Sequence, residues 1–68
     1  MTRAEQLAYE VRNAYYLEDV SDQLLEMGRM AGCEREVSEL LKIDDRKFRD
    51  FVLLQIQNRL GVWLYDKE

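Results

Sequence analysis

The sequence contains no histidine, and this absence narrows the chemistry open to its side chains. Histidine is the residue most often used for proton transfer near neutral pH and the commonest ligand for transition metals. Two acidic pairs, Glu18-Asp19 and Asp44-Asp45, lack the spaced loop with a central glycine that calcium sites use, and we interpret them as solvated helix caps. We therefore expect a protein that is not an enzyme and that holds no metal ion and no cofactor.

Cys33 is the single cysteine, so no disulfide can form within the chain. A small chain without such cross-links is typical of a reducing compartment, and we expect a cytoplasmic protein. The thiol is either a reactive group at a helix start or a small side chain packed at a turn, and we favour the packed side chain. The apolar runs fall far below the roughly 20 residues needed to cross a bilayer, so we expect no membrane contact.

Four tyrosines and one tryptophan supply rings with a polar group, a side-chain type that is enriched at protein interfaces. Tyr9 and Tyr16 are seven positions apart, which places them on nearly one line of a helix, away from its apolar side. Met30 also lies off the apolar pattern. We predict that Tyr9, Tyr16 and Met30 bind a partner protein; the alternative is that the tyrosines cover the edges of a small core. Trp63 is expected in the core.

The segment 37–51 has a distinctive placement of small, apolar and capping residues: Ser38, Leu41, Ile43, Asp44, Phe48 and Phe51. This placement resembles that of a helix-turn-helix unit. In such a unit Arg46, Lys47 and Arg49 point outward from the start of the second helix, where side chains reach the bases and phosphates of a major groove. Lys42 stands where such units often have glycine, and nearby aspartates dilute the positive charge. DNA binding is therefore the second hypothesis, and a plain helical hairpin is the simpler interpretation.

Length and charge limit the remaining functions. With 68 residues and 8.2 kDa the chain has room for a single domain, 1–68, and a domain of this size is short of core. The net charge of −4 disfavours nonspecific binding to phosphate backbones, and residues 1–33 carry three basic against six acidic groups. We expect a homodimer that completes its core, and a partner protein that is basic or itself binds nucleic acid.

The elements that must position these residues are helices, since the chain has no proline and only three glycines. Thr2 and Glu5 have the spacing of a capping box, which predicts a helix from Arg3. Apolar residues then recur in steps of three and four and predict a buried stripe, with Ala8 and Tyr15 at its margin. The stripe consists of Ala4, Leu7, Val11 and Ala14.

A second stripe has the same spacing but is rotated by one extra step of three. It consists of Leu17, Val20, Leu24, Met27 and Ala31. The slip indicates either a stammer in one long helix or a break near residues 19–21, where Asp19 or Ser21 could cap a new helix. We favour a break or bend, and we expect Gly32 to end this region in the left-handed conformation.

Two further helices are predicted after Gly32. The first covers about 34–42, with Val37, Leu40 and Leu41 inward, and Asp44 is placed to cap the second. The second covers about 45–59. Its apolar side is formed by Phe48, Phe51, Val52, Ile56 and Leu60, and it is widened by Leu53 and Leu54. Gly61 either ends this helix or lies within it, so residues 62–65 are left open as helix, strand or tail.

These patterns predict an all-α protein, an irregular bundle of three or four helices with a helix-turn-helix-like pair at 34–59. The function we predict is a small protein-protein interaction module of the adaptor, regulator or inhibitor type, which acts through a helical surface. The alternative is a DNA-binding transcriptional regulator.

Overall fold

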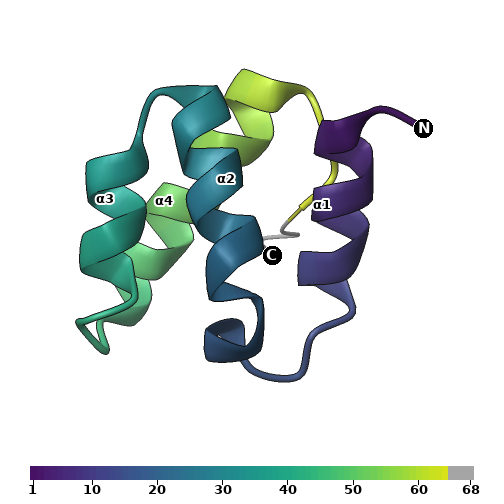
Figure 1. Cartoon of the computed structure of the whole chain (residues 1–68). Helices are drawn as coiled ribbons and strands as arrows, with labels where there is room; N and C mark the ends of the chain where they lie inside the picture. Colours follow the sequence, from purple (N-terminus) through teal and green to yellow (C-terminus); the bar gives the residue numbers. More distant parts are fainter. Residues whose placement is uncertain (65–68) are drawn as a thin grey trace.

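The computed structural model describes residues 1–64, which form four α-helices and one short 3-10 helix (Figure 1). In chain order these are α1 (Arg3–Arg12), the 3-10 helix η1 (Leu17–Val20), α2 (Ser21–Ala31), α3 (Glu34–Leu40) and α4 (Arg46–Leu60). The described part of the chain contains no strand. The predicted all-α bundle is therefore confirmed.

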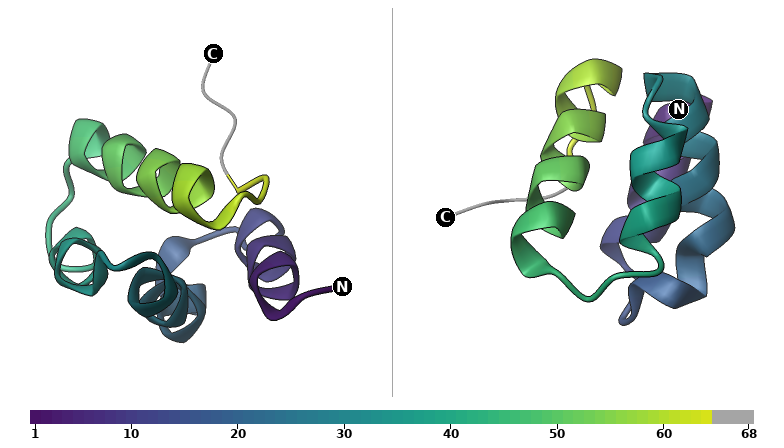
Figure 2. Two further views of the ribbon diagram at one scale, coloured as in Figure 1. Left: turned by 90° about the horizontal axis from the view of Figure 1, so that it is seen from above. Right: turned by 90° about the vertical axis from the view of Figure 1, so that its left-hand side faces the viewer.

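The helices form two layers. α1, α2 and α3 stand side by side in a row, and α4 crosses behind them from the α3 side toward the α1 side (Figures 1 and 2). α2 contacts α1, α3 and α4, so it is the central element. This arrangement packs one face of α4 against the row and leaves its opposite face outward.

α1 begins where the sequence predicts but ends before its apolar stripe does. The Thr2 hydroxyl accepts a hydrogen bond from the Glu5 N–H at 3.1 Å, and a Glu5 carboxylate oxygen accepts one from the Thr2 N–H at 2.9 Å. This reciprocal pair completes the capping box. At the other end the Asn13 side chain donates to the Tyr9 carbonyl at 2.8 Å. A side-chain amide bonded to nearby backbone in this way competes with helical hydrogen bonds and favours a stop.

The predicted break between the two stripes is confirmed, but the predicted caps are wrong. The chain leaves the helix over 13–16, forms η1 and enters α2 at Ser21. The N-cap of α2 is Val20, which makes no side-chain cap bond, and the Ser21 hydroxyl donates to the Glu18 carbonyl at 2.6 Å. Because α1 and α2 are separate helices, both stripes can face one core.

Gly32 ends α2 as predicted, with a φ of 76° in the left-handed region that glycine adopts readily. The end of α2 receives a second cap from α4, because an Arg59 guanidinium nitrogen donates to the Ala31 carbonyl at 2.9 Å. α3 then begins at Glu34 and ends at Leu40, two residues before its predicted end.

α4 is capped by Asp45 and not, as predicted, by Asp44. The Asp45 carboxylate accepts a hydrogen bond from the Phe48 N–H at 3.1 Å. Gly61 follows the last residue of the helix with a φ of 65°, so it is a C-cap and does not lie within the helix. Residues 62–64 have no regular structure, and Tyr65, which the sequence placed in the same segment, lies outside the described residues.

The core is aliphatic apart from two sulfur-containing side chains. Its buried members are Leu7, Ala8, Val11, Val20, Leu24, Met27, Ala31, Cys33, Val37, Leu40, Val52, Leu53, Ile56 and Leu64. Three expectations about rings are wrong, because Tyr15, Phe51 and Trp63 are 88%, 57% and 61% exposed. The buried residues of α4 include Leu53 and Ile56, and Phe51 lies on the opposite, outward side of the helix.

Candidate functional site

Cys33 is packed at the turn between α2 and α3, as the sequence indicates. Its side chain is buried, and burial raises the pKa of the thiol above its ordinary value of 9.0; the charge of Arg59 lowers this pKa by less, and the charge of Glu36 raises it slightly further. A buried thiol with a raised pKa is protonated at neutral pH and reacts poorly. Cys33 is therefore part of the core and not of a reactive site.

The aromatic side chains lie mostly on the outside of the molecule. Of the six rings in residues 1–64, five are more than half exposed and only Phe48 is partly buried. The exposed rings are Tyr9, Tyr15, Tyr16, Phe51 and Trp63. Rings are large apolar groups that a small domain would normally use to fill its core. Their outward placement identifies candidate contact surfaces.

Tyr15 and Tyr16 form one pair of rings in the connection between α1 and η1. Their ring centroids are 4.8 Å apart and their planes are inclined by 69°, an edge-to-face contact. The predicted single helical line through Tyr9 and Tyr16 is wrong, because α1 ends at Arg12 and Tyr16 is the N-cap of η1. The Asn13 side chain hydrogen-bonds to the backbone at the end of α1. An asparagine at this position is the sequence signal that could have predicted the helix end.

Tyr9 belongs to a second group of rings, which is joined by a cation. The guanidinium carbon of Arg12 lies 4.7 Å from the ring centroid of Trp63 and 5.9 Å from that of Tyr9. The same guanidinium donates a hydrogen bond to the Trp63 carbonyl. Arg12 therefore holds the segment after α4 against α1. The Trp63 ring in this contact lies on the surface and not in the core.

Met30 does not join either group of rings. It lies in the last turn of α2 and is 45% exposed, whereas Tyr16 lies before η1, at the other end of α2. The 11 residues of α2 span about 16 Å. The structure therefore leaves all three predicted partner-binding residues accessible but does not bring them together.

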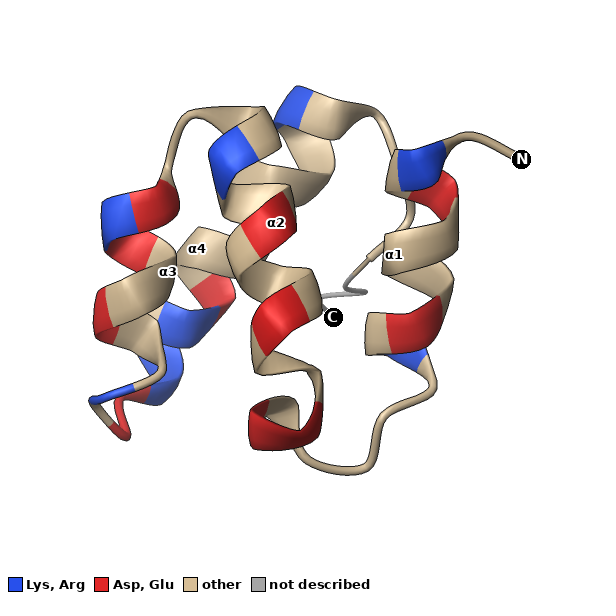
Figure 3. Ribbon diagram, in the orientation of Figure 1, with Lys and Arg blue, Asp and Glu red and all other residues tan. Residues whose placement is uncertain are grey.

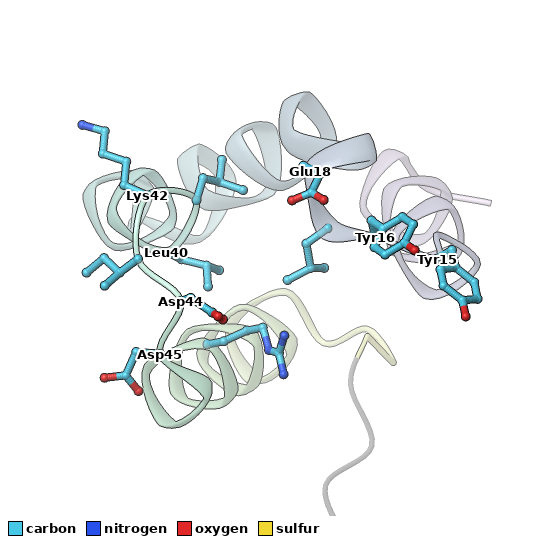
Figure 4. A pocket seen from close by; sticks show the side chains of 11 residues that line it. Tyr15, Tyr16, Glu18, Leu40, Lys42, Asp44 and Asp45 are labelled. Atoms are coloured by element: carbon cyan, nitrogen blue, oxygen red, sulfur yellow. The ribbon is translucent and has the colours of Figure 1, made fainter.

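A hollow opens where the start of η1, the end of α3 and the start of α4 meet (Figure 4). We call it the end hollow. It has a volume of about 420 Å³, and its lining residues are 15–18, 40–45 and Arg49. Glu18 and Asp44 direct their carboxylates into it, whereas Lys42 and Asp45 point away (Figure 4). Two carboxylates are directed into the end hollow against the one guanidinium of Arg49 in its lining, and the ring of Tyr16 lies at its edge, so the hollow suits a cationic side chain better than an anionic one.

The end hollow adjoins a surface of uniform charge. Residues 13–28 include four acidic and no basic side chains, so this segment alone has a charge of −4, equal to that of the whole chain. Figure 3 shows these acidic positions in red on η1 and α2. We call Tyr15, Tyr16, Glu18, Asp19 and Asp22 together the aromatic–acidic surface.

The residues of the DNA-binding hypothesis have mixed positions. Arg46 and Lys47 are exposed at the start of α4, while Arg49 is half-buried and lines the end hollow. The predicted helix pair exists as α3 and α4, but two of its expected apolar anchors are wrong: Ile43 is 51% exposed and Phe51 is 57% exposed. The apolar spacing that suggested a helix-turn-helix unit therefore does not correspond to a packed turn.

Residues 1–64 contain no group of three or more cysteine, aspartate or glutamate side chains placed to hold a metal ion. They also contain no helix with the length and apolar character needed to span a bilayer.

Comparison with known proteins gives no relative. No protein-family model matches the chain, and no curated protein and no solved structure is significantly similar to it.

Proposed function

We propose that this protein is a non-enzymatic protein-binding module that holds a basic partner on its aromatic–acidic surface. The observation that carries the proposal is the outward placement of five of the six described rings around an aliphatic core. Rings supply large contact areas at a low cost in side-chain entropy, which is why they are frequent at the centres of interfaces.

The charge of the same region supports a basic partner. Residues 13–28 carry four carboxylates and no cation; Glu26 is paired with Arg3, and the other three belong to the aromatic–acidic surface. Two carboxylates of the end hollow point into it. Complementary charge raises the rate of association and disfavours acidic competitors, including nucleic acid. The partner could itself be a nucleic-acid-binding protein, since such proteins present basic surfaces.

We also propose that the module self-associates as a homodimer. Apolar side chains remain accessible on the outward face of α4, where Phe51 is exposed and Leu54 is half-buried. A domain of this size gains stability when a second copy covers such a face.

The test is site-specific photo-crosslinking in native lysate, with a benzophenone side chain in place of Tyr16 and, in a matched variant, in place of Met30. We expect the benzophenone at position 16 to capture a defined basic protein. In affinity capture with a tagged chain that carries no benzophenone, we expect Tyr15→Ala combined with Tyr16→Ala to weaken retention of that protein by about tenfold or more. Tyr9→Ala combined with Tyr16→Ala tests whether the Tyr9 and Trp63 rings extend the surface.

Two controls separate the alternatives. Nuclease treatment leaves the cross-link intact if the partner is a protein held directly, and removes it if nucleic acid bridges the two. Equal capture from the Met30 position would show that the surface is wrongly placed. Salt-sensitive binding to duplex DNA that is lost on changing Arg46, Lys47 and Arg49 to alanine would favour the DNA-binding regulator instead.

A further inference from the structure

The outward face of α4 carries a seam of four residues that recur in steps of four, three and four: Lys47, Phe51, Leu54 and Asn58. This spacing places the four side chains on one line along the helix. Phe51 is 57% exposed and Leu54 is half-buried, whereas Leu53 and Ile56 on the inward face are buried. A shallow hollow of about 500 Å³ runs along the seam and is lined by side chains of α4 alone.

We propose that this seam is the surface on which two copies of the chain associate, with the two α4 helices antiparallel about a two-fold axis that passes between Phe51 and Leu54. The inference rests on the self-association proposed above and specifies its face and orientation. It does not depend on the aromatic–acidic surface.

The order of side chains along the seam makes it complementary to itself only when the helices run in opposite directions. A two-fold interface requires that if residue i contacts residue j, then j also contacts i. With the axis between Phe51 and Leu54, Phe51 packs on Leu54 of the partner subunit at the centre. At each end, Lys47 meets Asn58 of the partner subunit, whose side-chain carbonyl can accept its hydrogen bond.

Charge distinguishes the antiparallel arrangement from the parallel one. Lys47 is the single charged member of the seam and lies at one end of it, and Asp50, which lines the same hollow, would also face its own copy in a parallel pair. In a parallel pair the two lysines would lie side by side and repel each other. In the antiparallel pair they are separated by 11 residues of rise, about 16 Å, which is beyond the screening length of about 8 Å at physiological salt.

A single pair of helices forms a small interface. We therefore expect it to bury less than about 1,200 Å² and the association to be weak. The apolar contact is concentrated at the centre, where water is excluded, and the polar ends remain hydrated. The expected behaviour is a molar mass that rises with concentration from 8.2 kDa toward twice that value.

The test uses paired charge substitutions and sedimentation equilibrium over a concentration series. Phe51→Glu alone places a carboxylate against the partner subunit's Leu54, and Leu54→Lys alone places an ammonium against the partner subunit's Phe51. Each variant is expected to weaken self-association by about tenfold or more. An equimolar mixture is expected to restore it, because one contact becomes a Glu–Lys pair and the other stays apolar. Met30→Glu, at a position of similar exposure on α2, is the matched control and is expected to leave self-association unchanged.

The mixture is the decisive experiment. In a parallel pair, residue 51 would face residue 51 of the partner subunit and residue 54 would face residue 54, so mixing the two variants would bring no opposite charges together. A second measurement covers the case in which the half-buried Leu54 does not tolerate lysine. In a Cys33→Ala background, Lys47→Cys mixed with Asn58→Cys is expected to form a disulfide between copies faster than either variant does alone.

Each contrary result overturns a stated part of the inference. A wild-type chain of 8.2 kDa at all concentrations overturns self-association itself. If Phe51→Glu loses association, the mixture does not restore it, and the cysteine variants do not cross-link preferentially when mixed, the antiparallel arrangement is overturned. Unchanged association in Phe51→Glu shows that the copies meet elsewhere. None of these results bears on partner capture at Tyr16, so the two proposals fail separately.

Discussion

Gly28 of α2 lies directly against Val37 of α3. A Cβ atom built on Gly28 would come within 2.8 Å of a Val37 methyl carbon and within 3.2 Å of the Glu34 Cα atom. Real Cβ atoms do not approach other carbons so closely, so these two helices can pack at this distance only because residue 28 has no side chain. The packing of α2 against α3 in the row of three helices therefore depends on this glycine.

Gly28→Ala is expected to destabilise the fold by about 1–2 kcal/mol. Overpacking of a core costs about 1–3 kcal/mol, and the better helix propensity of alanine offsets up to about 1 kcal/mol of it. Urea unfolding followed by circular dichroism measures the change. Adding Val37→Ala to Gly28→Ala removes the clashing methyl, so the double variant is expected to lose less than the sum of the two single losses. Additive losses would mean that the contact between the helices is not what limits residue 28.

The local parts of this fold follow from short-range signals in the sequence. The capping box of Thr2 and Glu5 and the left-handed Gly32 depend on residues within a few positions, and both are predicted correctly. The break between α1 and α2 follows from the change in phase of the apolar stripe. Its position does not, because it depends on a competing hydrogen bond from the Asn13 side chain.

The candidate site could be predicted only in part. The apolar stripe leaves Tyr9 and Tyr16 outside the predicted core, but the residues around them are set by tertiary contacts that periodicity does not contain. Arg12 reaches Trp63 across 51 positions of sequence, and this contact holds an apolar ring outside the core. Tyr15 followed the stripe in the sequence, yet it is exposed because the helix has already ended.

Two glutamines on α4 differ in their hydrogen bonds, and this difference predicts opposite effects of one substitution. The side-chain oxygen of Gln57 accepts from the Leu64 N–H at 2.9 Å, whereas the buried side-chain oxygen of Gln55 accepts no hydrogen bond from the described residues. Gln57→Met is expected to cost about 1 kcal/mol by leaving the Leu64 N–H unsatisfied. Gln55→Met removes an unsatisfied acceptor and is expected to be neutral or stabilising by up to about 1 kcal/mol.

Urea unfolding of both glutamine variants at low protein concentration measures these changes without a contribution from self-association. A loss in Gln55→Met as large as that in Gln57→Met would contradict the assignment of hydrogen bonds on α4.

The ion pair between α1 and α2 predicts how stability depends on pH. Two nitrogens of Arg3 donate to Glu26 at 2.7 and 2.8 Å, and this hydrogen bonding holds the pKa of Glu26 below its ordinary value of 4.5. A carboxylate whose pKa is lower in the folded state stabilises the fold above its unfolded pKa, and the stabilisation is lost as the pH falls through the folded pKa. The melting temperature of Glu26→Gln is therefore expected to lie below that of the wild type at pH 7, and the two are expected to converge as the pH falls below 4.5 through the folded pKa of Glu26.

Removing the other partner provides the control for this pH effect. Arg3→Gln is expected to produce the same convergence, and the double variant is expected to add little to either single change. The wild-type slope will not vanish in these variants, because the bonds to Thr2 also lower the pKa of Glu5 in the same direction. A constant difference between the wild type and Glu26→Gln at pH 7 and pH 3 would show that the ion pair does not contribute.

The contact between Arg12 and Trp63 can be followed directly, because Trp63 is the single tryptophan and its fluorescence reports on this site alone. The guanidinium lies over the indole ring and also donates to the Trp63 carbonyl, so it holds the segment that carries the buried Leu64. Arg12→Met keeps an unbranched apolar stem but removes both interactions, and we expect a stability loss of about 1 kcal/mol with a red-shifted emission that acrylamide quenches more easily. Arg12→Lys keeps the charge but lacks the planar group that can stack on the ring and donate a hydrogen bond at the same time. Its emission wavelength is therefore expected to lie between those of the wild type and Arg12→Met. If quenching in Arg12→Met equals that of the wild type, packing of Leu64 alone holds this segment, and Arg12 does not set the exposure of the ring.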